Sequence, residues 1–149
     1  MKRFAQRLVQ SLSFNGYKKR LIKIAEILSF VQDYSNSDSE EFIEQKFISE
    51  VASKCGLVMD WKPNFEEFKE NFKNIATIEE TVIIESIPET AWVSNQEIVA
   101  TLKRKMRDNS GERVPVLIES LGDFCHFILV PLENLETIES AAGGWLIDT

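Results

Sequence analysis

The sequence predicts an α+β fold in which a helical N-terminal half packs on a small, mainly antiparallel sheet of about three to four strands. In residues 18–76 the apolar residues recur every three or four positions, the period of amphipathic helices, whereas β-branched and aromatic runs follow in residues 80–149. The chain of 149 residues is 44% hydrophobic with 10 Phe and 3 Trp, enough apolar area to bury a core. We therefore expect a single domain spanning residues 1–149.

Helices are expected along the N-terminal half. Residues 2–12 predict a short amphipathic helix that ends at an Asn-Gly turn signal. Residues 18–33 are apolar on most of the helix circumference, so this second helix should be buried on more than one side. A third helix begins near Ser37–Ser39, where Ser37 with Glu40 fits a capping box, and continues to Cys55. Gly56 is expected to stop it, and residues 59–64 are expected to form a connector.

The helix period then gives way to a strand. Asn64 with Glu67 predicts the start of a fourth helix, which continues to about residue 76 and carries a stripe of phenylalanines. Residues 81–87 are rich in β-branched side chains and precede a proline, which predicts a strand. A second capping pair, Ser94 with Glu97, starts a further helix.

The C-terminal part is expected to be a hairpin followed by short elements. Residues 114–120 and 124–130 are apolar runs joined by Leu-Gly-Asp, which predicts two antiparallel strands. Pro115 places the first strand at a sheet edge, or marks its start, because proline cannot donate to the ladder. A short helical stretch follows at 132–138, and residues 145–149 end the chain as a strand.

The only histidine, His126, directly follows Cys125, one of two cysteines. Neighbouring residues of a strand point to opposite faces, so in a strand at 124–130 the thiol and the imidazole cannot meet. Apolar residues on both sides of this segment indicate a central strand that is covered on both faces. We therefore interpret Cys125 and His126 as core residues rather than as a nucleophile with its base.

The net charge of −7 is distributed unevenly along the chain. Residues 1–25 contain seven Lys and Arg and no acid, whereas residues 26–149 contain the other ten against all 24 Asp and Glu, a charge of −14. Three alternatives stay open for the basic segment: packing on the acidic remainder of the chain, binding nucleic acid, or lying on an anionic membrane. A second basic run, Lys103–Arg107, lies in the last turns of its helix, where cations stabilise the helix dipole.

No motif for a cofactor or a metal is present. Phosphate-loop, dinucleotide and Cys-x-x-Cys spacings are absent, so we expect neither. Acidic clusters such as Glu40–Glu44 and Glu133–Glu139 are interpreted as solvated helix faces. No apolar run approaches the roughly 20 residues that span a bilayer, and two cysteines are too few for a secreted disulfide framework. A cytoplasmic location is expected.

The expected function is a non-catalytic protein-binding module, such as an adaptor, inhibitor or immunity-type factor, because no catalytic constellation accompanies the charged, aromatic-bearing surface. Its candidate contacts with a protein partner are two tryptophans in connecting segments and the N-terminal cations: Trp61, Trp92, Lys2, Arg3, Arg7, Lys18, Lys19 and Arg20. One alternative is a regulator that binds nucleic acid or an anionic membrane surface through the basic N-terminal segment. A second alternative is an enzyme that uses Cys125 or His126 with carboxylates.

Overall fold

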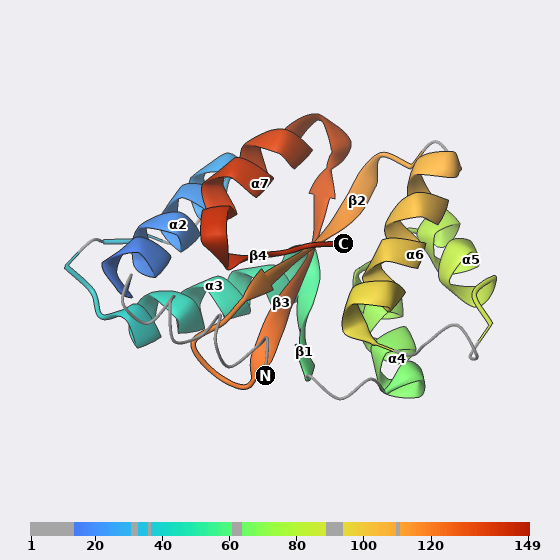
Figure 1. The fold of residues 1–149 in the computed structure, drawn as a ribbon, viewed down its shortest axis with the longest axis horizontal. Coiled ribbons are helices and arrows are strands. Elements are labelled where there is room, and N and C mark those ends of the chain that lie inside the picture. The colour runs from blue at the N-terminus through green and yellow to red at the C-terminus, as the bar shows by residue number, and fades with distance from the viewer. Residues whose placement is uncertain (1–13, 31–32, 36, 61–63, 89–93, 110) are drawn as a thin grey trace.

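The fold is an α+β arrangement of one four-stranded antiparallel sheet with helices on both faces, as the sequence predicts (Figure 1). The computed structural model describes residues 14–30, 33–35, 37–60, 64–88, 94–109 and 111–149. Within these ranges, no helix is both long enough and apolar enough to cross a membrane.

The sheet has the strand order β1-β3-β2-β4, and all pairings are antiparallel. Its strands are β1 (Gly56–Asp60), β2 (Arg113–Glu119), β3 (Phe124–Pro131) and β4 (Leu146–Ile147). The predicted hairpin of β2 and β3 is confirmed, and β3 is the central strand between β1 and β2. Because β4 pairs only with Leu117 and Ile118, Pro115 lies where β2 has no outer neighbour among the described strands.

The helices form a layer on each side of the sheet. They are α2 (Phe14–Ile27), α3 (Glu40–Lys54), α4 (Phe65–Ile75), α5 (Ile78–Glu85), α6 (Asn95–Asp108) and α7 (Leu135–Ala142), with the 3-10 turns η2 (Leu132–Asn134) and η3 (Gly143–Trp145). Helices α2, α3 and α7 lie on one side, and α4, α5 and α6 lie on the other (Figure 1). Side chains of β3 alternate between the two layers: Ile128 enters the first core, and Phe127 enters the second.

Helix caps follow the sequence closely, with one shift. Asn64 and Ser94 each accept the backbone N–H three residues later, at 3.1 and 3.2 Å, so both predicted N-caps are confirmed. The cap of α3 is Ser39, not Ser37: its hydroxyl accepts the N–H of Phe42 at 3.2 Å. The predicted start near Ser37–Ser39 is therefore confirmed, whereas the capping box of Ser37 with Glu40 was wrong.

The strand predicted at 81–87 was wrong, because most of this segment belongs to α5. Thr77 accepts the N–H of Glu80 at 3.1 Å, and the Glu80 carboxylate accepts the N–H of Thr77 at 2.8 Å. This reciprocal capping box satisfies two backbone donors at the helix start. The cap and the burial of Ile83 and Ile84 against the second core outweigh the β preference of the branched side chains.

Other expectations around α2 and β1 are also corrected. The Asn-Gly pair expected to form a turn lies inside α2, which begins at Phe14. Helix α2 ends at Ile27 rather than at Asp33, because Ser29 adopts a left-handed conformation (φ 57°). Strand β1 (Gly56–Asp60) was not predicted: it contains Gly56, expected as a helix stop, and the first two residues of the expected connector at 59–64. The helix expected at 2–12 lies outside the described residues.

Gly56 provides a test of the packing between α3 and the sheet. A Cβ at this position would overlap the Phe127 carbonyl oxygen and the Val51 Cγ1. We expect Gly56→Ala to lower the free energy of unfolding by about 2 kcal/mol, because a strand carbonyl and a buried side chain would both have to shift to admit the Cβ. Gly144→Ala is the matched control: a Cβ on Gly144 would have no other atom within 4 Å, so its effect should stay within about 0.5 kcal/mol. Equal urea denaturation midpoints for the two variants would contradict this packing.

Candidate functional site

Cys125 and His126 project to opposite faces of β3, as the sequence predicts. The Cys125 thiol donates to the Met59 carbonyl at 3.8 Å, in the core beneath α4 and α6. The His126 ring lies edge-on to Phe47, with ring centroids 5.4 Å apart, in the core beneath α2 and α3. Both side chains have an exposed fraction of 0%, so neither meets a solute in this conformation.

His126 belongs to a buried polar cluster with Tyr17 and Glu44. The Tyr17 hydroxyl donates to Glu44 Oε2, and His126 Nε2 lies 3.0 Å from the Tyr17 oxygen and 3.3 Å from Glu44 Oε2. Because the single phenolic proton is directed to Glu44, His126 Nε2 must be the donor in both of its contacts. The Leu121 N–H donates to the same Glu44 oxygen at 3.2 Å. The cluster thus ties α2 and α3 to β3.

The ionisation of this cluster follows from its hydrogen bonds. Burial raises the pKa of the Glu44 carboxyl, but hydrogen bonds from His126, Tyr17 and the Leu121 N–H outweigh it and hold the pKa below its ordinary value of 4.5. Burial and the neighbouring Glu44 carboxylate raise the pKa of Tyr17 well above its ordinary value. At neutral pH the Glu44 carboxyl is therefore ionised and the Tyr17 hydroxyl keeps its proton. The interpretation of Glu44 as part of a solvated face was wrong.

The predicted partner-binding residues divide into two groups. Trp61, Trp92, Lys2, Arg3 and Arg7 lie outside the described residues.

The other three predicted residues lie on α2. Lys18 Nζ donates to the Asp38 carbonyl at 2.9 Å, and Arg20 Nη1 donates to the Ala141 carbonyl at 3.1 Å. Lys19 is exposed. Two of the three cations therefore bind backbone carbonyls of their own chain.

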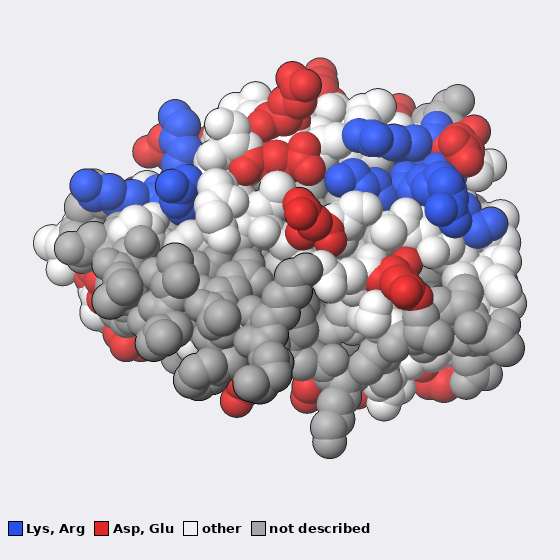
Figure 2. Space-filling view, in the orientation of Figure 1, with Lys and Arg blue, Asp and Glu red and all other residues white. Residues whose placement is uncertain are grey.

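The second basic run lies on α6. Lys and Arg side chains gather over this helix, apart from those over α2, in the space-filling view (Figure 2). Lys103, Arg104 and Arg107 line a surface hollow together with the C-terminal Thr149. Lys103 also pairs with Glu139 at 3.5 Å.

A larger hollow lies beside α5, and we call it the α5 groove. It has a volume of about 710 Å³, and its lining includes Thr77, Glu79, Val82, Asn109, Glu112 and Arg113. Arg113 forms part of its wall: Nε donates to Glu80 Oε2 at 3.1 Å, and Nη2 donates to the Ile75 carbonyl at 2.9 Å. These bonds hold α5 against the start of β2.

The edge of the α5 groove is apolar and acidic. Ile78 and Val82 are neighbours one turn apart on α5, and their side chains are 82% and 64% exposed. The exposed Leu132 lies close by, since its N–H donates to the Glu112 carbonyl at 2.9 Å. Glu79 and Glu112 are exposed, and neither has a cationic partner among the described residues. The sequence did not predict this surface, because residues 81–87 were expected to form a strand. The Thr77–Glu80 capping box was the available signal of a helix.

Glu44→Gln tests the buried cluster. We expect this change to lower the free energy of unfolding at pH 7 by about 3 kcal/mol, because it removes the charged acceptor from two buried donors. The folded-state pKa of Glu44 is lowered, so its contribution is complete above the unfolded-state pKa and is lost as the pH falls through the folded-state pKa. The difference between wild type and variant should therefore shrink below pH 4.5.

The control for this prediction is Glu41→Gln, an exposed position on the same helix. Its effect should stay within about 0.5 kcal/mol at every pH. Chemical denaturation of the three proteins between acidic and neutral pH measures both effects. A loss of stability in Glu44→Gln no larger than that in Glu41→Gln would exclude a stabilising role for the cluster.

No protein-family model, curated protein or solved structure matches this chain. The features that bear on function are therefore those of the chain itself. They are the buried cluster around His126, the α5 groove, and the part of α6 that carries Lys103, Arg104 and Arg107, which we call the basic face of α6.

Proposed function

We propose that this protein is a non-catalytic protein-binding module and that the α5 groove is its contact surface. The observation that carries the proposal is the exposure of Ile78 and Val82 side by side on α5. Removing apolar surface from water is favourable by roughly 25 cal/mol per Å². A partner that covers these two exposed side chains would therefore gain binding free energy. Apolar patches with a polar rim are typical of protein interaction sites.

The charge of the rim indicates the kind of partner. Glu79 and Glu112 line the groove without a cation among the described residues, so the groove offers carboxylates beside its apolar edge. Complementary charges across an interface raise association rates and exclude wrong partners. The proposed partner is therefore a protein that presents an apolar side chain flanked by Lys or Arg.

The groove is preorganised for such a contact. The Thr77–Glu80 capping box defines the start of α5, and the buried Glu80 carboxylate is also held by Arg113 of β2. A site whose elements are already ordered loses less conformational entropy on binding. An interface of ordinary size buries roughly 800 Å² on each partner, so the contact would extend beyond the groove towards Leu132.

A cytoplasmic location is part of the proposal. Cys55 and Cys125 form no disulfide, and burial raises the pKa of the Cys55 thiol to about 11. Persistent free thiols are typical of proteins in reducing compartments.

The double variant Ile78→Ser/Val82→Ser tests the contact surface. A photo-reactive phenylalanine at position 82 should cross-link a partner that is identified by mass spectrometry and then purified. We expect the double variant to bind this purified partner at least about 30-fold more weakly, since buried anchor residues at an interface contribute 2 kcal/mol or more. Calorimetric titration measures the loss.

Phe42→Ser is the matched control, because Phe42 is 50% exposed on α3, in the helix layer on the other side of the sheet (Figure 1). It should leave the affinity within twofold of wild type. Affinity unchanged in the double variant, or equally reduced in Phe42→Ser, would place the contact surface away from α5.

Nucleic-acid binding is the second candidate function, and the basic face of α6 favours it (Figure 2). Neutralising phosphates with Lys and Arg releases counterions, so binding of this kind falls steeply as salt rises. Binding to a DNA duplex at low salt should weaken about tenfold or more in Arg104→Ala/Arg107→Ala if this face makes the contact. Absence of duplex binding at low salt would remove this candidate.

A further inference from the structure

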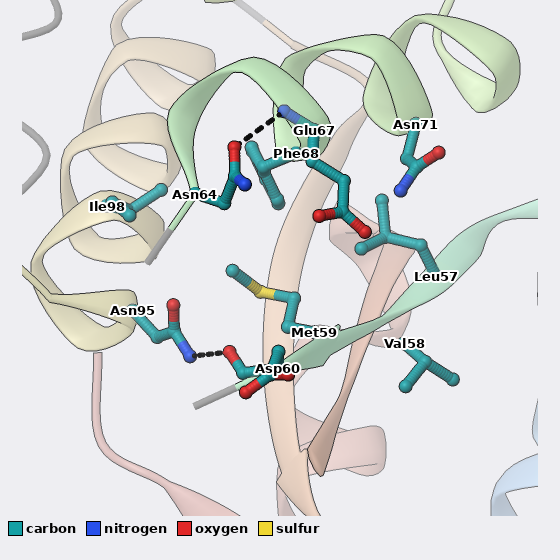
Figure 3. A pocket seen from close by; sticks show the side chains of 10 residues that line it. All are labelled: Leu57, Val58, Met59, Asp60, Asn64, Glu67, Phe68, Asn71, Asn95 and Ile98. Atoms are coloured by element: carbon teal, nitrogen blue, oxygen red, sulfur yellow. Dashed lines mark hydrogen bonds between the residues drawn. The ribbon is translucent and has the colours of Figure 1, made fainter. Parts of the chain in front are cut away.

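A small hollow lies beside the end of β1, between the first turns of α4 and α6 (Figure 3). Its volume is about 40 Å³. Met59 and Phe68 contribute apolar walls, and Glu67, Asn71 and Asn95 contribute polar ones. The hollow is at the opposite end of α6 from Asn109 and the α5 groove, so it is independent of the proposed contact surface.

Asn95 shows that the hollow is built to receive a hydrogen-bond donor. The residue is 4% exposed, and its Nδ2 donates to the Asp60 carbonyl at 2.7 Å, which fixes the orientation of the amide. Its Oδ1 is buried and has no hydrogen-bond partner among the described residues. Figure 3 shows this oxygen directed into the space between α4 and α6. A buried acceptor without a donor costs about 1–3 kcal/mol, which a bound N–H group would recover.

Glu67 contributes a negative charge to the lining of the hollow. Its carboxylate points into the hollow from the first turn of α4, with the Asn71 amide one turn later (Figure 3). No cation pairs with Glu67 among the described residues. The described part of the chain holds no group of three or more His, Cys, Asp or Glu side chains suited to a metal ion. Two carboxylates, Glu67 and Asp60, with side-chain amides above apolar walls are instead suited to an organic cation.

The size of the hollow limits the ligand. A water-sized group needs roughly 10–15 Å³ of such volume, so there is room for about three non-hydrogen atoms. A charged nitrogen with the last carbons of its chain fits, whereas an aromatic ring is too large. We propose that this hollow binds the ammonium end of an alkyl chain. The nitrogen donates to Asn95 Oδ1 and faces the Glu67 carboxylate across the hollow, and the carbons contact Met59 and Phe68.

Titration of the full ¹⁵N-labelled chain with n-butylammonium, monitored by NMR, tests the proposal. Saturable shifts are expected for the side-chain amides of Asn71 and Asn95, and n-butanol, which lacks the charge, should produce none. Glu67→Gln should weaken binding at least tenfold. Glu66→Gln is the matched control, since it removes the same charge from the same helix turn but does not line the hollow, and it should change affinity less than twofold.

A second variant and a second probe complete the experiment. Asn71→Ala, at an exposed position, should weaken binding two- to fivefold with an otherwise unchanged spectrum. Nα-acetyl-lysine methylamide distinguishes the sources of the ammonium: binding of both probes supports capture of a lysine side chain, and binding of butylammonium alone supports a free amine. Shifts that do not saturate, that n-butanol reproduces, or that Glu67→Gln and Glu66→Gln affect equally would overturn the proposal.

Discussion

The structure depends on β3 being covered on both faces and paired on both edges. Each of its interior side chains enters one of two cores, and each of its interior backbone groups faces β1 or β2. The strict alternation of a strand therefore decides which helix layer each residue serves. A shift of register by one residue would exchange Cys125 with His126 and place an imidazole against Met59 instead of Glu44. The buried polar cluster thus specifies the register as well as adding stability.

Buried glutamates hold the helices to the sheet and to one another. Glu44 of α3 accepts from Tyr17 of α2 and His126 of β3, and Glu80 of α5 binds Arg113 of β2. A carboxylate taken out of water is strongly unfavourable unless donors replace its hydration, so each of these acids restricts where its neighbours lie. Directional bonds of this kind select one arrangement among the many that bury apolar area equally well. Some of the acidic residues of the chain therefore fix the positions of helices and strands inside the fold instead of facing solvent.

Sequence reasoning predicted those features that depend on local pattern. The hairpin, the central position of β3 and the caps at Asn64 and Ser94 all follow from alternation, turn residues or capping side chains within a few positions. The prediction failed where a tertiary contact decides. Most of the β-branched segment 81–87 is helical, because Glu80 is held by the distant Arg113 as well as by its capping box with Thr77. The α5 groove and the hollow beside β1 combine residues separated by about thirty positions, a proximity that periodicity does not encode.

Pro115 has a consequence for how the sheet meets other molecules. Among the described residues, only the two of β4 pair with the outer side of β2, and a sheet edge left open there would be a template for another chain's backbone. The Leu129 N–H donates to Cys55 of the β1 side, so the backbone nitrogen opposite it, that of Pro115, is directed away from β3. Because the proline nitrogen carries no hydrogen, it cannot donate a backbone hydrogen bond to an added strand. The proline therefore protects the molecule against edge-to-edge aggregation.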